Sequence, residues 1–178
     1  MKPSEQLAIY LYTAIDSLGE KMNKEMAGWA SGRPRTDGLA NFAFTFYKGL
    51  QALPPYEGEV YRKVASKFVE KPLGTRVTWN GFTSATADWS QVSDGDASIV
   101  YLIQSKSGRY LGPYSRYPQN SEVVLLPGTS FTITNYFVKN MVVFSQANIR
   151  ETSYLASPAN IEKVKEGSQG IIIELTEE

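Results

Sequence analysis

The order of helix-like and strand-like segments constrains the fold of this chain most. In the first third of the chain, apolar residues recur at spacings of three and four positions, which is typical of helices with one buried face. We expect helices over the ranges 4–18, 19–29 and 39–50. Ser4 can cap the first helix, and its expected buried face consists of Leu7, Leu11, Ala14 and Leu18.

From residue 60 onward, the pattern changes to short runs rich in β-branched and aromatic residues, separated by glycine and proline turns. Strands are expected over 60–64, 76–82, 99–104, 123–126, 131–136, 138–144 and 171–175. Turns are expected at 72–74, 94–95, 106–108, 127–128 and 167–170. Helices followed by strands predict an α+β fold in which helices pack against antiparallel sheet. At 178 residues we expect one domain, 1–178, with a helical lobe over 1–55 and mostly β structure over 56–178.

The composition excludes several classes of function. The chain has no histidine and no cysteine, so acid–base work by imidazole, a thiolate nucleophile and a His/Cys zinc site are all impossible. Its 18 basic residues balance its 18 acidic ones, which argues against attraction to nucleic acid or to an anionic membrane. No apolar run approaches the roughly 20 residues of a membrane helix, and the N-terminus lacks the apolar core of a signal peptide. Any catalysis must therefore come from carboxylates, hydroxyls, lysine or arginine.

Three polar residues are candidates for that chemistry, each with an ordinary structural alternative. Arg62 lies in a strand-like run and is either an exposed-face residue or a fixed guanidinium for a phosphate. Ser84 follows a strand and either starts a turn or supports a carboxylate, since no histidine can activate it as a nucleophile. Glu122 opens an apolar run after a polar loop and is either a catalytic carboxylate or a solvated strand-edge residue.

The order of these three residues and their surroundings resembles the mono-ADP-ribosyltransferase superfamily of the Arg–Ser–Glu class, which includes bacterial toxins and vertebrate ecto-enzymes. The similar segments are 53–64, 74–86 and 117–131. The first contains an aromatic–Arg pair, the second an aromatic residue followed by Ser84, and the third Glu122 followed by an apolar strand and Pro–Gly. The resemblance implies an ADP-ribosyltransferase-like fold, in which N-terminal helices pack on two antiparallel-rich β-sheets around an NAD cleft.

The resemblance also implies roles for the candidate residues, with NAD as cosubstrate and no metal. Arg62 would bind the NAD phosphates, and Ser84 would orient Glu122. Glu122 would accept a hydrogen bond from the ribose 2′-hydroxyl and stabilise the positive charge that develops when nicotinamide leaves. Trp89 lies where the family has its nicotinamide-side loop, so it either covers the nicotinamide or anchors the core or surface.

The acceptor side departs from the family pattern. Tyr117, in a loop expected over 108–120, matches the family's acceptor-recognition aromatic. Asn120 stands two residues before Glu122, where arginine-modifying members have Glu and members that modify asparagine of Rho-type GTPases have Gln. Because Asn cannot act as a carboxylate base, arginine becomes a doubtful acceptor, and an amide, a hydroxyl or water gains weight. The second motif also has Ala85 in place of its middle Thr, so only Ser84 carries over from it.

The leading prediction is an enzyme: an NAD-dependent mono-ADP-ribosyltransferase, a pentosyl-type glycosyltransferase that modifies a protein. We expect a soluble bacterial toxin or virulence effector domain, secreted or delivered into a target cell and acting in its cytoplasm. The alternatives are an NAD glycohydrolase with water as acceptor, and a catalytically inactive fold that serves as a binding module. A host activating or binding protein stays open as a further partner. The stretch 138–170 resembles the family less and is either a partner-binding insertion or a longer loop.

Overall fold

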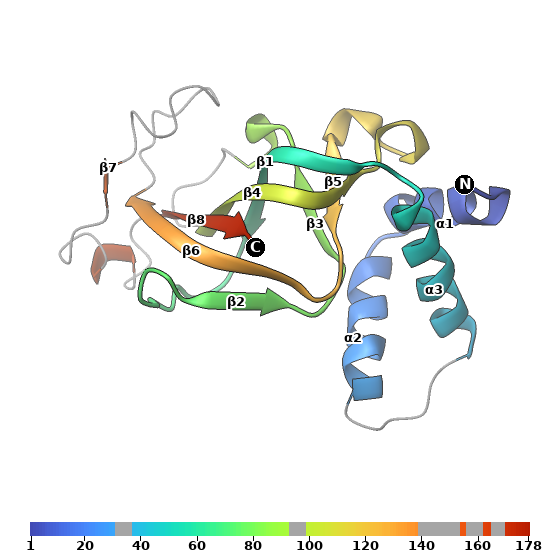
Figure 1. Ribbon diagram of the computed structural model, residues 1–178, viewed down its shortest axis with the longest axis horizontal. Coiled ribbons are helices and arrows are strands. Elements are labelled where there is room, and N and C mark those ends of the chain that lie inside the picture. The colour runs from blue at the N-terminus through green and yellow to red at the C-terminus, as the bar shows by residue number, and fades with distance from the viewer. Residues whose placement is uncertain (31–36, 93–98, 139–153, 156–161, 165–169) are drawn as a thin grey trace. The chain divides into compact units, whose positions relative to one another are not determined.

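The computed structural model describes residues 1–30, 37–92, 99–138, 154–155, 162–164 and 170–178 (Figure 1). The chain divides into two compact units. The first comprises Met1–Tyr56, Trp79–Ser84 and Ser107–Thr129; the second comprises Glu57–Thr78, Ala85–Lys106 and Ser130–Glu178. Outside the described residues lie the expected turn at 94–95 and most of three expected features: the strand over 138–144, the turn at 167–170 and the stretch 138–170.

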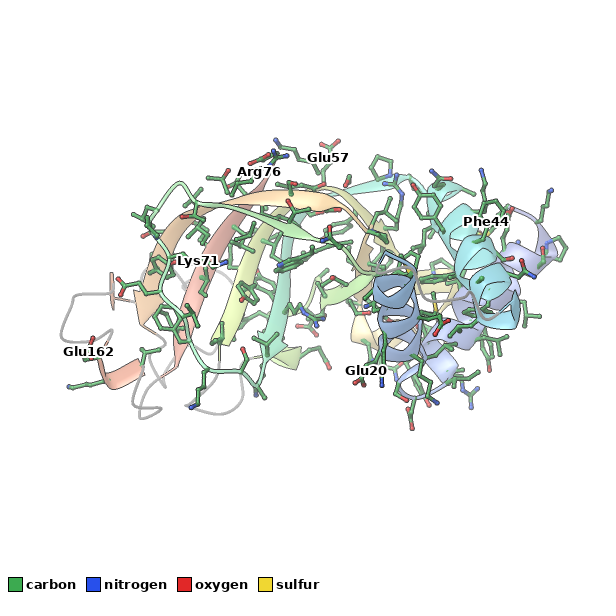
Figure 2. The ribbon with its side chains drawn as sticks, turned by 90° about the horizontal axis from the view of Figure 1, so that it is seen from below. Glu20, Phe44, Glu57, Lys71, Arg76 and Glu162 are labelled. Carbon is green, nitrogen blue, oxygen red and sulfur yellow. The ribbon has the colours of Figure 1, made fainter. Side chains whose placement is uncertain are left out.

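The first unit contains three helices: α1 (Pro3–Ala14), α2 (Leu18–Ala30) and α3 (Asp37–Gln51). Helix α3 packs against both α1 and α2, as Figure 1 shows for α2 and α3. Between them, Tyr12 stacks on Phe46 with ring centroids 4.2 Å apart, and Phe46 meets Phe82 edge-on at 5.0 Å. On the outside of α3, Phe44 is 63% exposed (Figure 2). The expected second and third helices are therefore confirmed, each slightly longer than predicted.

Helix α1 differs from the prediction at its start, at its end and on its buried face. It ends at Ala14, whereas the range 4–18 was expected, and Leu18 begins α2. Helix α1 begins at Pro3 with Lys2 as N-cap, in place of Ser4, because the Lys2 N–H donates to the Glu5 carboxylate at 2.7 Å. The buried residues are Ala8, Ile9 and Tyr12, whereas Leu7 is 56% exposed. Two overlapping apolar stripes share this helix, and the one that carries the aromatic ring packs on α3.

The strands are β1 (Pro55–Val64), β2 (Arg76–Trp79), β3 (Thr83–Thr86), β4 (Ile99–Tyr110), β5 (Glu122–Leu125), β6 (Thr129–Val138), β7 (Tyr154–Leu155) and β8 (Ile171–Glu177). Short 3₁₀ helices lie at η1 (Trp89–Gln91), η2 (Gly112–Tyr114) and η3 (Pro118–Asn120). The strand order is β1-β3-β5-β4-β8-β6-β2, with β7 on β6 and an additional pairing of β1 with β4. These pairings join the expected two sheets into one eight-stranded set, in which β4 and β8 run parallel.

The strand expected over 76–82 is interrupted, because a helix side chain takes the place of a strand partner. The Asn23 amide nitrogen of α2 donates to the Phe82 carbonyl at 2.7 Å, and its Oδ1 accepts from the Phe82 N–H at 2.8 Å. Strand β2 therefore ends at Trp79, and β3 begins at Thr83. A Cβ at Gly81 would lie 2.7 Å from Asn23, so a glycine allows the close approach.

The turn expected at 106–108 is wrong, since β4 continues through it to Tyr110. The Glu177 carboxylate accepts hydrogen bonds from the Lys106 N–H at 2.6 Å and from the Ser105 hydroxyl at 3.1 Å. The turns at 72–74 and 127–128 are confirmed, and their glycines have positive φ angles. Gly128, at φ 86, also donates its N–H to the Trp79 carbonyl at 2.8 Å.

The second unit has its own apolar core of Tyr61, Trp89, Val92, Val100, Leu102, Phe137 and Ile172. The end of β8 is fixed to β2 by an ion pair of 2.7 Å between Arg76, which Figure 2 labels, and Glu178. In the part of the chain that the structure describes, no helix combines the length and the apolar character needed to span a membrane.

Candidate active site

Glu122 is the first residue of β5, and the apolar strand behind it fixes its place. The following residues Val123, Val124 and Leu125 are fully buried, and the Glu122 carbonyl accepts a hydrogen bond from the Leu111 N–H at 2.9 Å. Ser121, directly before it, adopts a left-handed conformation with φ 48, which turns the chain from η3 into the strand. The carboxylate is thus held, half-buried, on a well-anchored backbone.

The structure brings the side chains of Ser84 and Glu122 together within the first unit, which is the contact that the family resemblance implied. Burial raises the pKa of the Glu122 carboxyl above its ordinary value of 4.5, and the hydrogen bond from the Ser84 hydroxyl opposes that rise. Burial disfavours the charged form because water no longer solvates it, whereas a hydrogen-bond donor favours it. A carboxylate in this setting is suited to stabilise a positive charge that develops beside it.

Sequence reasoning missed two residues that hold Ser84 in place. The Tyr12 hydroxyl lies 2.8 Å from the Ser84 Oγ, and Asn23 binds both backbone groups of Phe82, two residues earlier. Tyr12 could have been found as the one buried-face residue of α1 with a hydroxyl, since Ala8, Ile9 and Tyr12 follow helical spacing. Nothing in the sequence around Asn23 indicates its contact, which depends on the tertiary fold.

The two acceptor-side candidates lie at the ends of η3, in the same unit as Glu122. Tyr117 is 44% exposed and its N–H donates to the Ser115 hydroxyl at 3.0 Å, while the Asn120 N–H donates to the Tyr117 carbonyl at 3.0 Å. The Arg116 N–H donates to the Thr13 hydroxyl at 2.8 Å, which fastens the segment to the end of α1. The expected loop over 108–120 starts at 111, because β4 extends to Tyr110.

Arg62 and Trp89 belong to the second unit. Arg62 is half-buried on β1. Burial raises the pKa of Tyr101, and the charge of Arg62 opposes that rise. Trp89 is 2% exposed and meets Tyr61 edge-on at 5.3 Å, which is the environment of a core residue. The phosphate-binding role of Arg62 and the nicotinamide-covering role of Trp89 stay predictions.

A protein-family model and a known ADP-ribosyltransferase are similar to this chain in sequence. A family model described as NAD:arginine ADP-ribosyltransferase matches residues 1–149. The NAD(+)–protein-arginine ADP-ribosyltransferase Tre1 of Serratia proteamaculans is 32% identical over 136 residues, which are 75% of this chain and 29% of that protein. The chain thus spans less than a third of this relative's length. Both descriptions name arginine.

Two solved structures share the fold. The type III effector XopAI from Xanthomonas axonopodis pv. citri is similar with a TM-score of 0.63 at 20% identity, covering 100% of this chain and 68% of that chain. The ADP-ribosyltransferase Vis from Vibrio splendidus, solved in complex with agmatine, has a TM-score of 0.65 at 15% identity, covering 99% of this chain and 75% of that chain. At these identities, the likeness shows the fold alone.

Proposed function

This chain belongs to the NAD:arginine ADP-ribosyltransferase family, and we propose that it cleaves NAD and transfers ADP-ribose to a protein acceptor. The observation that carries the proposal is the half-buried Glu122 at the start of β5, hydrogen-bonded by the Ser84 hydroxyl. It occupies the third of three segments that resemble the family's motifs, in the family's order.

In the proposed reaction, the bond between nicotinamide and the ribose C1′ breaks with its electron pair on nicotinamide, which leaves as a neutral molecule. The positive charge shifts to the ribose, and the Glu122 carboxylate stabilises it there. An acceptor atom then attacks C1′ and loses its proton. Because the carboxylate is partly desolvated, its interaction with the developing cation is stronger than in water. Arg62 would hold the NAD phosphates through two parallel hydrogen bonds.

For the acceptor, we propose the guanidinium of an arginine side chain. The family description, the name of Tre1 and the agmatine bound to Vis support it, since agmatine carries a guanidinium group. Asn120 can accept a hydrogen bond from such a group through its amide oxygen, but it cannot take a proton. Among the candidate residues, Glu122 is then left as the proton acceptor, and its raised pKa makes it a better base. The exposed ring of Tyr117 would contact the acceptor.

A bacterial toxin or effector role is part of the proposal, with action in the cytoplasm of a target cell. It is supported by XopAI, which is named a type III effector. The proposals that the protein is secreted and acts in virulence rest on the same likeness to XopAI. A glycohydrolase with water as acceptor is the second candidate, favoured by Asn120, which lacks the carboxylate of arginine-modifying relatives.

The test compares the protein with its Glu122→Gln variant. Both are incubated with biotin-labelled NAD, with bacterial or eukaryotic lysate or with agmatine, and free nicotinamide and labelled products are measured. We expect labelled agmatine and a discrete labelled protein band, and a drop of about 100-fold or more in rate for the variant. Glu57→Gln, at an exposed position on β1 that Figure 2 labels, is the matched control and should keep full activity.

Each outcome decides between the candidates. Rapid nicotinamide release without labelled product would replace the transferase by a glycohydrolase. Full activity in the Glu122→Gln variant would refute the assigned site. If the unmodified protein neither releases nicotinamide nor labels any acceptor, an inactive fold that binds NAD or a partner would be the better explanation.

A further inference from the structure

We infer that Tyr12 of α1 is a positioning residue for the reaction, acting on Glu122 through Ser84. This inference rests on the proposed function of the same site. It starts from one contact between residues 72 positions apart in the chain: the Tyr12 hydroxyl and the Ser84 Oγ are 2.8 Å apart. The Ser84 hydroxyl also bonds the Glu122 carboxylate, so three side chains from α1, β3 and β5 form a chain.

The direction of these hydrogen bonds follows from a count of hydrogens. An ionised carboxylate only accepts, so the single hydroxyl hydrogen of Ser84 must point to Glu122. With that hydrogen used, Ser84 can only accept from Tyr12, and the phenol hydrogen must point to the Ser84 Oγ. The bonds therefore run from Tyr12 to Ser84 to Glu122. Donation at one end of such a chain polarises the next donor and strengthens its bond.

The surroundings hold the phenol ring in one place. The ring stacks on Phe46, with centroids 4.2 Å apart and planes 17° apart, and Phe46 is fully buried. On another side, the end of the Tyr12 ring passes Gly19: a Cβ at that glycine would lie 2.9 Å from the Tyr12 hydroxyl. Tyr12 itself is only 9% exposed. A buried aromatic ring needs no hydroxyl for packing, and in Tyr12 that hydroxyl lies within hydrogen-bond distance of the Ser84 Oγ.

Loss of the Tyr12 hydroxyl should affect the turnover of NAD more than its binding. If Tyr12 keeps Ser84 pointed at Glu122, loss of the phenol oxygen should weaken an interaction that matters most in the transition state. Turnover should fall while the KM for NAD changes little. Beside Glu122, β3 presents the Ser84 hydroxyl, behind which lies the Tyr12 hydroxyl of α1. The diagonal neighbour of Glu122 on β4 is Arg109, whose guanidinium donates to the carbonyls of Ser107 and Gly108.

The experiment uses Tyr12→Phe, which removes one oxygen and keeps the stacked ring. Tyr10→Phe is the control, because Tyr10 lies on the same helix and is 39% exposed. For nicotinamide release we expect Tyr12→Phe to lower kcat about 5- to 10-fold, as loss of one hydrogen bond does, with KM for NAD changed by less than about 2-fold. In a Ser84→Ala background, the same change should have no further effect, because the connection to Glu122 is already cut.

Two results would overturn the inference: an unchanged kcat in Tyr12→Phe, or an equal drop with and without Ser84, which would mean a general structural role. A second measurement does not depend on catalysis. Carbon-13 NMR of the labelled Glu122 carboxyl should show a higher titration midpoint in Tyr12→Phe than in the unmodified protein, and an unmoved midpoint would count against the role of Tyr12. Failure of the proposed function would appear separately, as absence of nicotinamide release from the unmodified protein.

Discussion

Replacement of Asn23 by alanine tests whether α2 holds the strand that carries Ser84. Asn23 acts as a substitute strand partner: its amide nitrogen donates to the Phe82 carbonyl at 2.7 Å, and its amide oxygen accepts from the Phe82 N–H at 2.8 Å. Alanine removes both bonds and supplies no replacement. Phe82 is only 4% exposed, so water is poorly placed to satisfy the two backbone groups that are left.

The magnitude follows from those two groups. A hydrogen bond contributes about 1 kcal/mol net, and a buried backbone group left without a partner costs about 1–3 kcal/mol. Since this contact is only partly buried, we expect Asn23→Ala to lower the free energy of unfolding by about 2–4 kcal/mol. Alanine is also a better helix former than asparagine, and this offsets the loss of stability by a few tenths of a kcal/mol.

Asn41→Ala controls for the gain in helix propensity, because Asn41 is exposed on α3. Urea unfolding, followed by tryptophan fluorescence, would compare the two variants. For a chain of 178 residues, the expected difference corresponds to a melting temperature lower by about 5–15 °C. Asn23→Ala should also release nicotinamide more slowly, since Ser84 is two residues beyond the lost contact. If the two variants unfold within about 0.5 kcal/mol of each other, the assigned role of Asn23 is refuted.

Two further predictions concern backbone strain and pH. Gly128→Ala should destabilise the protein by about 1–2 kcal/mol because Gly128 has φ 86, although no atom lies within 4 Å of the added Cβ. Gly38→Ala, equally free of contacts but in α3, should stabilise by up to about 1 kcal/mol, and a denaturant series on both variants checks the difference in sign. Burial raises the pKa of Glu122, so the native state binds its proton more tightly than the unfolded chain does. The contribution of Glu122 to stability is therefore full below pH 4.5 and is lost as the pH rises through the folded-state pKa. Glu122→Gln should be at least as stable as the unmodified protein at pH 7.5 and lose that advantage towards pH 4, as urea unfolding at each pH would reveal.

The sequence predicted the elements whose signals are local. Helices α2 and α3 have apolar spacing and end near glycine or proline, and the turns predicted at 72–74 and 127–128 precede β2 and β6 in the structure. The resemblance to the ADP-ribosyltransferase superfamily is confirmed by the match of the family model to residues 1–149. The resemblance implied that Ser84 orients Glu122, and the structure places a hydrogen bond from the Ser84 hydroxyl on the Glu122 carboxylate, while the catalytic roles of both residues stay predictions.

The sequence could not predict elements that depend on distant partners. The residues at 106–108 have the composition of a turn, but Glu177 in β8 binds the Lys106 N–H and keeps β4 extended. The break before β3 requires Asn23 on another element. On α1, the predicted buried face included Leu7, whereas packing on Phe46 buries the face that carries Tyr12. In each case, a tertiary contact outweighs the local preference.

These contacts give the helices of the first unit a direct part in the proposed chemistry. The backbone before Ser84 is held by Asn23 from α2, and the Ser84 side chain by Tyr12 from α1. Phe46 of α3 connects the two, since its ring meets Tyr12 at 4.2 Å and Phe82 at 5.0 Å. A catalytic carboxylate is effective only when its donors are fixed before the charge develops. Because all three helices contribute to fixing Ser84, the proposed orientation of Glu122 depends on them through the Ser84 hydroxyl.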